Sequence, residues 1–202
     1  MDTESPSGFL RLFVAIPVPE TVRKEIARAQ GRLKREAPPG TVRWTRPDQF
    51  HITLKFLGDI AISQLEAVKE SLAAICAGSP ALSLTARGIG FFPNTRRPRV
   101  IWAGAHDELG GLAELHRQVD KALRPFAPAE RTETFTGHIT LGRFKPGHHS
   151  ATSRIVEHAE IFRTREFGEW SAGQFELVRS ELNSAGAEHL PIASYSLAKT
   201  AQ

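Results

Sequence analysis

The tetrapeptide His51-Ile52-Thr53-Leu54 recurs as His138-Ile139-Thr140-Leu141, and this repeat decides the predicted fold of the 202-residue chain. Both copies follow a Phe and a short turn-like segment, and both precede a basic residue and another Phe. The copies begin at positions 51 and 138, a separation of 87 residues. This spacing favours one motif in each half of the chain.

The apolar neighbours of both copies predict β-strands. In a strand, residues i and i+2 lie on the same face, about 7 Å apart, and the residue between them points the other way. Each copy therefore places an imidazole beside a hydroxyl on one exposed strip, while its Ile points into a core. Two such strips facing each other would form a symmetric pair of acid and base.

The remaining hydrophobic periodicity predicts alternating strands and helices. Ser63, with Glu66 three residues later, is typical of a capping box at the start of a helix. Leu109 is expected on the apolar face of the following long helix. We predict strands over 9–17, 41–46, 51–57, 82–86, 100–103 and 138–144, a hairpin over 174–197, and helices over 19–36, 63–77, 108–124 and 152–162.

Several of these strands are too close in sequence for crossover helices, which favours antiparallel pairing. The two halves resemble degenerate copies of one unit. We therefore predict an α+β fold with two pseudo-symmetric lobes, each a mainly antiparallel sheet with helices outside, around a shared central cleft. The lobes form a single bilobal domain over 1–202, and residues 1–8 are expected to be a flexible tail.

The composition is that of a soluble globular protein, with 41% hydrophobic and 24% charged residues. No apolar run approaches the ~18–20 residues of a membrane span. The acidic N-terminus lacks the features of a signal peptide, and the single cysteine, Cys76, excludes an internal disulfide and a cysteine metal cage. We expect a cytoplasmic monomer with no membrane partner.

The charge of the chain permits an anionic substrate without requiring one. Lys and Arg total 26 against 22 Asp and Glu, a net charge of +4. Arg96, Arg97 and Arg99 cluster in a Pro-rich loop. This loop is either a solvated turn or a contact for a phosphate backbone beside the cleft.

The doubled motif suits the opening of a cyclic phosphodiester by water. One group must accept the proton of water while another protonates the departing alkoxide, and histidine can serve in either role near neutral pH. Thr53 and Thr140 offer hydroxyls to the charge on the non-bridging oxygens, and Arg143 is the best candidate for a guanidinium clamp. A purely structural role for one strand histidine is the alternative, but two copies in matched contexts favour catalysis.

Other sites are less well supported by the residue pattern. Each motif supplies one possible metal ligand, without a cysteine or a suitably spaced carboxylate, so no metal and no cofactor are expected. The six remaining histidines, His189 among them, lack the His-x-Thr setting. We therefore predict no role for them in the site.

The motifs and their surroundings resemble the 2H phosphoesterase superfamily, and within it the RNA 2′,3′-cyclic phosphodiesterases, also called 2′-5′ RNA ligases or LigT-like proteins. The matching segments are 12–17, 44–58, 98–104 and 135–143. The resemblance implies an enzyme that hydrolyses RNA 2′,3′-cyclic phosphate ends to 2′-phosphomonoesters without metal. It also implies possible reverse 2′-5′ RNA ligation.

The resemblance also implies residue roles. His51 would be the acid toward the 3′ oxygen and His138 the base that activates water, although the pseudo-symmetry permits the reverse. Thr53, Thr140 and Arg143 would hold the phosphate. Phe13 would stack on the terminal base or serve as a core residue. The alternatives are a phosphodiesterase acting on 2′-5′ oligonucleotides or small cyclic nucleotides, and a non-catalytic RNA-binding module.

Overall fold

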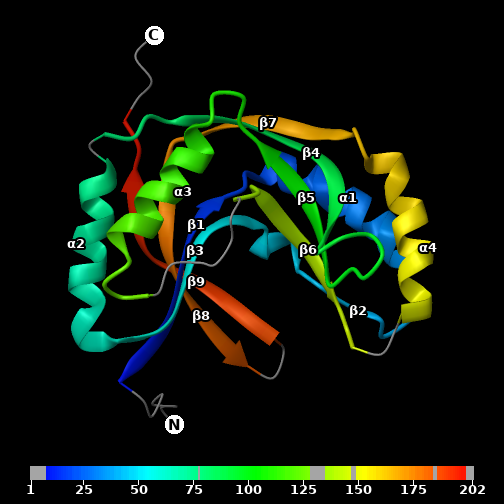
Figure 1. Cartoon of the computed structure of the whole chain (residues 1–202), viewed down its shortest axis with the longest axis horizontal. Coiled ribbons are helices and arrows are strands. Elements are labelled where there is room, and N and C mark those ends of the chain that lie inside the picture. Colours follow the sequence, from blue (N-terminus) through cyan, green and yellow to red (C-terminus); the bar gives the residue numbers. More distant parts are fainter. Residues whose placement is uncertain (1–7, 77, 128–134, 147–148, 184–185, 199–202) are drawn as a thin grey trace.

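A computed structural model describes residues 8–76, 78–127, 135–146, 149–183 and 186–198. Within these residues, helices surround a strongly curled antiparallel sheet (Figure 1). The tail expected over residues 1–8 lies outside the described residues except for Gly8, whose carbonyl accepts a hydrogen bond from Ile62 N at 2.9 Å. No helix in these ranges is long and apolar enough to cross a membrane.

The sheet has the strand order β7-β4-β5-β6-β3-β1-β8-β9, and β2 pairs with β6. All pairs between these strands are antiparallel, as the sequence predicts, but β7 was not foreseen. The strands are β1 (Phe9–Pro17), β2 (Val42–Trp44), β3 (His51–Ala61), β4 (Leu82–Phe92), β5 (Val100–His106), β6 (His138–Phe144), β7 (Glu166–Ala172), β8 (Gln174–Asn183) and β9 (Gly186–Ser196).

The helices follow the predicted order but differ in their ends. Ser63 lies inside a 3-10 turn that precedes the second helix, so this helix begins later than the capping box predicts. Leu109 is 91% exposed because the third helix begins only at Gly111. The elements are α1 (Glu20–Glu36), α2 (Leu65–Cys76), α3 (Gly111–Ala122) and α4 (His149–Ala159), with 3-10 turns η1 (Pro47–Gln49), η2 (Ile62–Gln64) and η3 (Glu160–Phe162).

The helices are exchanged between the two halves of the chain. Helix α1 follows β1 in sequence but packs against β7 and α4, while α3 follows β5 but packs against β3 and α2. One lobe therefore contains β3, β1, β8 and β9 with α2 and α3, and the other contains β6, β5, β4 and β7 with α1 and α4 (Figure 1). This arrangement confirms the α+β fold class. The two sheets join into one through β3 and β6.

A buried ion pair ties α3 to β3. Lys55 is fully buried, and its Nζ lies 2.7 Å from Asp120 Oδ1, whose side chain is 15% exposed. Burial opposes ionisation of Asp120, but the hydrogen bond and charge of Lys55, together with Arg124, lower the pKa of this carboxyl overall. The stability that the lowered pKa contributes is therefore present above the unfolded-state pKa of Asp, about 3.9, and is lost as pH falls through the folded value.

We expect Asp120→Asn to lower the free energy of unfolding by about 3 kcal/mol, because it removes the carboxylate that lies against a fully buried ammonium. Urea denaturation at pH 7 measures the loss. Glu114→Gln is the matched control, since its ion pair with Arg117 is exposed and screened by solvent and should contribute little to stability. Equal losses of unfolding free energy in the two variants would show that the buried Lys55–Asp120 pair contributes no more to stability than an exposed pair.

Candidate active site

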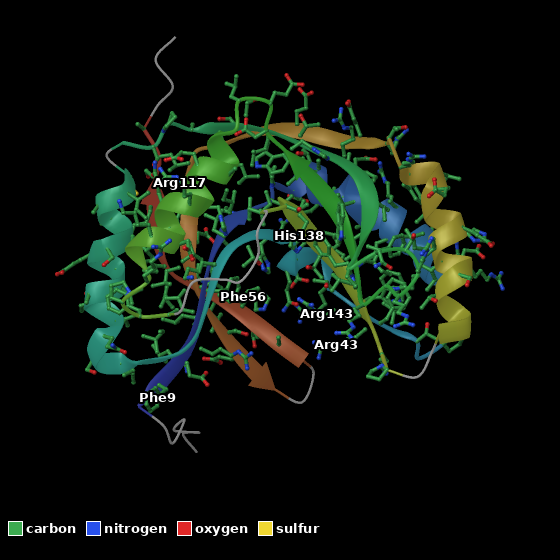
Figure 2. All side chains as sticks on the ribbon, in the orientation of Figure 1. Phe9, Arg43, Phe56, Arg117, His138 and Arg143 are labelled. Carbon is green, nitrogen blue, oxygen red and sulfur yellow. The ribbon has the colours of Figure 1, made fainter. Side chains whose placement is uncertain are left out.

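The two His-x-Thr strands meet at a single residue pair. Ile52 of β3 pairs with Ile139 of β6, and both side chains are fully buried. Because the strands are antiparallel and side chains alternate, the histidines and threonines beside these residues lie on the opposite face of the sheet. The predicted strips therefore come together on neighbouring strands of one continuous sheet. Figure 2 places His138 near the middle of the molecule.

Both imidazoles are oriented in the same way by their own backbone. His51 Nδ1 lies 2.7 Å from Gln49 O, and His138 Nδ1 lies 2.8 Å from Thr136 O. A carbonyl oxygen can accept a hydrogen bond but cannot donate one. Nδ1 therefore carries the proton in each ring, and Nε2 is the proton-accepting nitrogen of the neutral form. Gln49 is itself held, because its Nε2 donates to Ala187 O of β9 at 2.5 Å.

A β-bulge lies at the last residue of each tetrapeptide. Leu54 is the extra residue in β3 opposite β1, and Leu141 is the extra residue in β6 opposite β5. An inserted residue reverses the alternation of side chains beyond it. Arg143, five residues after His138, would face the core in a regular strand. The bulge instead turns it to the face of His138, in agreement with its exposed side chain.

The bulges also show which residues of the two motifs are equivalent. Lys55 corresponds to Gly142, and both are buried, whereas Phe56 corresponds to Arg143, and both are exposed. The two basic residues that follow the tetrapeptides are therefore not equivalent, because Lys55 enters the core and Arg143 lies on the histidine face. The pseudo-symmetry ends at this point, with an aromatic ring on one side of the site and a guanidinium on the other.

Aromatic rings surround His51. Phe13 packs against it, with a centroid distance of 4.9 Å to His51, 4.9 Å to His189 and 5.9 Å to Phe56. Phe13 is only 3% exposed, whereas Phe56 is 56% exposed. Phe56 is thus the accessible ring of this cluster. Stacking of a base on Phe13 stays a prediction.

His189 of β9 is a site residue that the sequence analysis missed. Its ring packs edge-on against His51 at 5.2 Å, and its buried Nδ1 has no hydrogen-bond partner among the described residues. Burial lowers the pKa of His189. The only available signal was the strand alternation of the C-terminal hairpin, which does not indicate that β9 lies near the first motif.

His138 has its own aromatic neighbours from β4 and β5. Phe92 packs edge-on against it at 4.9 Å, and Trp102 lies at 6.3 Å. The Trp102 ring occupies the space above Gly90, where a Cβ atom would lie 2.2 Å from the indole. Gly90 therefore permits the position of Trp102 beside His138.

The electrostatic environment of His51 favours its neutral form. Burial is the largest cause of a pKa lowered to about 4; the hydrogen bond to Gln49 O opposes the shift, and the positive charges of His189, His138 and Arg143 add to it. At pH 7 His51 is therefore a neutral base. Burial, followed by the charge of Arg43, also lowers the pKa of Arg143. An anion bound here would face several cationic or protonatable groups.

The Pro-rich loop that contains Arg96, Arg97 and Arg99 follows Phe92 of β4. In the loop after Phe92, Asn94 Oδ1 accepts hydrogen bonds from the backbone amides of Arg96 and Arg97, and Phe144 N donates to Arg99 O at 2.9 Å. The loop is thus attached to the end of β6, and its contact with phosphate stays a prediction.

No group of three His, Cys, Asp or Glu side chains in the described ranges is arranged to hold a metal ion.

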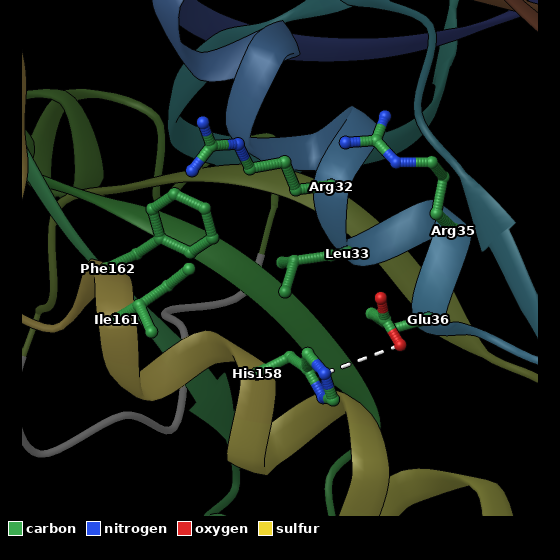
Figure 3. Close-up of a pocket in the computed structure, with 7 residues that line it drawn as sticks. All are labelled: Arg32, Leu33, Arg35, Glu36, His158, Ile161 and Phe162. Atoms are coloured by element: carbon green, nitrogen blue, oxygen red, sulfur yellow. Dashed lines mark ion pairs between the residues drawn. The ribbon is translucent and has the colours of Figure 1, made fainter.

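A separate pocket of about 170 Å³ lies between α1 and the α4–η3 segment (Figure 3). Arg32 and Phe162 line it, and His158 Nε2 lies 3.4 Å from Glu36 Oε2. None of the predicted site residues lines this pocket. It is therefore a different feature of the surface from the histidine face.

Comparison with known proteins identifies related sequences. A sequence profile described as "LigT like Phosphoesterase" matches residues 16–102. An RNA 2′,3′-cyclic phosphodiesterase of Methanocaldococcus jannaschii is 30% identical over 177 residues, covering 88% of this chain and 95% of that protein. A protein of the same name from Thermus thermophilus is 31% identical over 198 residues, covering 93% and 90%.

A solved structure shows the same architecture. The crystal structure of a protein from Thermus thermophilus superposes with a TM-score of 0.74 at 29% identity, covering 93% of this chain and 98% of that one. The similarity thus extends over most of the chain. The chain belongs to the LigT-like phosphoesterase family.

Proposed function

We propose that this protein hydrolyses RNA 2′,3′-cyclic phosphate ends to 2′-phosphomonoesters by metal-independent acid–base catalysis. The observation that carries the proposal is the pair His51 and His138, which lie on one face of adjacent strands and are oriented through matching Nδ1 contacts. The relatives that carry the name RNA 2′,3′-cyclic phosphodiesterase support this choice of substrate.

The proposed reaction is a single displacement at phosphorus. His138 Nε2 accepts a proton from water, the water oxygen forms a bond to phosphorus, and the bond from phosphorus to O3′ breaks. His51 Nε2 delivers its proton to O3′, which leaves as a hydroxyl, and the phosphate remains on O2′. Thr53, Thr140 and Arg143 donate hydrogen bonds to the non-bridging oxygens, where negative charge accumulates.

Substrate binding supplies the proton state that this assignment needs. His51 is neutral at pH 7 without substrate, because its pKa is about 4. The negative charge of a phosphodiester favours the imidazolium form and raises that pKa. The assigned role requires the bound anion to raise this pKa far enough for His51 to be protonated, and burial of the ring strengthens the effect of a nearby anion.

The aromatic cluster fits the nucleoside that carries the leaving oxygen. His51 protonates O3′, so the terminal ribose and its base lie on the β1–β3 side of the site. Phe56 is the exposed ring there, and Phe13 supports His51 and His189 from below. Stacking on an aromatic ring contributes about 1–3 kcal/mol per base and is tolerant of base identity.

An oligoribonucleotide with a 2′,3′-cyclic phosphate end tests the proposed function. We expect conversion to a 2′-phosphomonoester, identified by chromatography against 2′- and 3′-phosphate standards. The same turnover is expected in excess EDTA. A 3′-phosphate product would refute O3′ as the leaving group. Activity that is lost in EDTA and restored by a metal would refute the metal-independent mechanism.

Replacing either histidine should abolish most of the turnover. We expect His51→Ala and His138→Ala each to lower kcat by about 10²–10⁴-fold, since each removes one positioned proton transfer. His158→Ala, a change of an exposed histidine on α4, is the control and should retain wild-type kcat. Near wild-type activity in either site variant would exclude that histidine from the chemistry.

The residual activity of His51→Ala then separates acid from base. If His138 is the base, kcat/KM of this variant should rise with pH and level off, because only neutral imidazole accepts a proton. A decrease with rising pH would assign the acid role to His138 and exchange the two roles.

The pKa of His51 is directly measurable. We expect its imidazole to titrate near pH 4 in the substrate-free protein and at higher pH when inorganic phosphate is bound. NMR of 15N-labelled histidine follows both titrations, and His51→Gln identifies the resonance. A pKa near 6.5 for His51 would show that burial and the neighbouring cations do not lower the pKa of this residue.

A further inference from the structure

We propose that Arg43 of β2 is a second phosphate-binding residue, which holds the internucleotide phosphate on the 5′ side of the terminal nucleotide. The proposal rests on the proposed function, because it assumes an RNA whose cyclic end lies between the two histidines. It concerns a residue outside both His-x-Thr motifs. It would make the protein discriminate an RNA end from a single cyclic nucleotide.

Strand pairing places Arg43 on the histidine face. Strand β2 is antiparallel to β6, and Arg43 is directly opposite Arg143. Directly opposed residues in such a pair share a face of the sheet. The flanking pairs, Val42 with Phe144 and Trp44 with Gly142, contain residues buried in or packed against the core. Figure 2 shows Arg143 below His138 and Arg43 just below Arg143 in that view.

The two guanidiniums repel each other without a compensating carboxylate. Like charges in directly opposed positions destabilise a sheet, and the charge of Arg43 helps to lower the pKa of Arg143. Within the described part of the chain, no carboxylate lies within ion-pair distance of either residue. Arg46 and Arg117, by contrast, each contact a carboxylate.

The backbone holds this arrangement in place. Thr45 N donates to Leu141 O at 2.9 Å, and Gln30 Nε2 of α1 donates to both Thr45 O and Leu141 O at 2.8 Å. A Cβ atom on Gly142 would lie 2.8 Å from Val42 Cγ1, so β2 and β6 are in close contact. The arginines can therefore separate only by side-chain rotation. A bound anion would relieve their repulsion while the strands stay in place.

Position along the sheet indicates which phosphate Arg43 holds. In the proposed function the reacting phosphate lies between His51 and His138, on the strands joined by the Ile52–Ile139 pair, and the charge of Arg143 acts on His51. Strand β3 pairs with β6 at Ile139, whereas Arg43 lies opposite Arg143, four residues farther along β6. Arg43 is therefore displaced along the sheet from the proposed position of the reacting phosphate. The next anion along an RNA chain that ends in a cyclic phosphate is the internucleotide phosphate.

The test compares two substrates in one variant. Arg43→Gln should lower kcat/KM about tenfold or more for an oligoribonucleotide with a cyclic phosphate end, because it removes a charge-assisted contact to phosphate. The decrease should be much smaller for a nucleoside 2′,3′-cyclic phosphate, which has no internucleotide phosphate. For the oligonucleotide, the negative slope of log kcat/KM against log salt concentration should also become shallower by about 0.7.

Arg32→Gln is the matched control, because it removes one exposed positive charge from α1 and should leave kcat/KM for both substrates unchanged. Equal losses on both substrates in Arg43→Gln would show that Arg43 acts only through Arg143, and no loss on either would exclude a phosphate contact. Both outcomes overturn the proposal.

A binding measurement keeps this test separate from that of the proposed function. Absence of wild-type turnover on both substrates would refute the proposed function. In that case, fluorescence anisotropy with a labelled oligoribonucleotide that ends in a 2′-phosphate measures whether Arg43 contributes to RNA binding. Weaker binding to Arg43→Gln than to Arg32→Gln supports the phosphate contact, and equal binding overturns it.

Discussion

The site depends on the pairing of Ile52 with Ile139. This contact is where the sheets of the two lobes join, and both side chains are fully buried in the shared core. Because neighbouring residues of a strand point to opposite faces, burial of the two isoleucines requires both histidines to lie on the other face. A shift of one residue in either strand would turn its histidine toward the core. The hydrophobic core thus sets the register of the proposed catalytic groups.

The bulges at the ends of the two motifs make the site asymmetric. Each bulge reverses the alternation, so Phe56 and Arg143 share the histidine face while Lys55 is buried against Asp120 of α3. One side of the site thereby offers aromatic rings and the other offers guanidiniums. A nucleotide has the same division, with a flat base at one end and an anionic phosphate at the other. In the proposed function, the two similar motifs therefore bind two chemically different parts of one substrate.

The charges around the histidines favour an anion between them. His51 is neutral at pH 7 mainly because it is buried, and the neighbouring protonatable and cationic groups keep its pKa low. Arg143 lies directly opposite another arginine on β2. These groups oppose one another in the substrate-free protein. A bound phosphodiester would relieve the repulsion and at the same time favour the protonated form of His51, so binding and preparation of the acid are coupled.

Local patterns predicted the strands other than β7, the order of the helices, the antiparallel pairing and the exposed strand faces that carry His51 and His138, because hydrophobic alternation and helical periodicity depend on residues close in sequence. The place of Arg143 near the end of the second motif strand also made it a candidate. The position of His189 beside His51, the opposition of Arg43 and Arg143, and the burial of Lys55 were not foretold. Each of these depends on the packing of segments far apart in the chain: β9 near β3, β2 on β6 and α3 on β3. Residue type and spacing therefore determined which groups are available for chemistry, and only the long-range pairing of strands, with its bulges, decided which of them face one another.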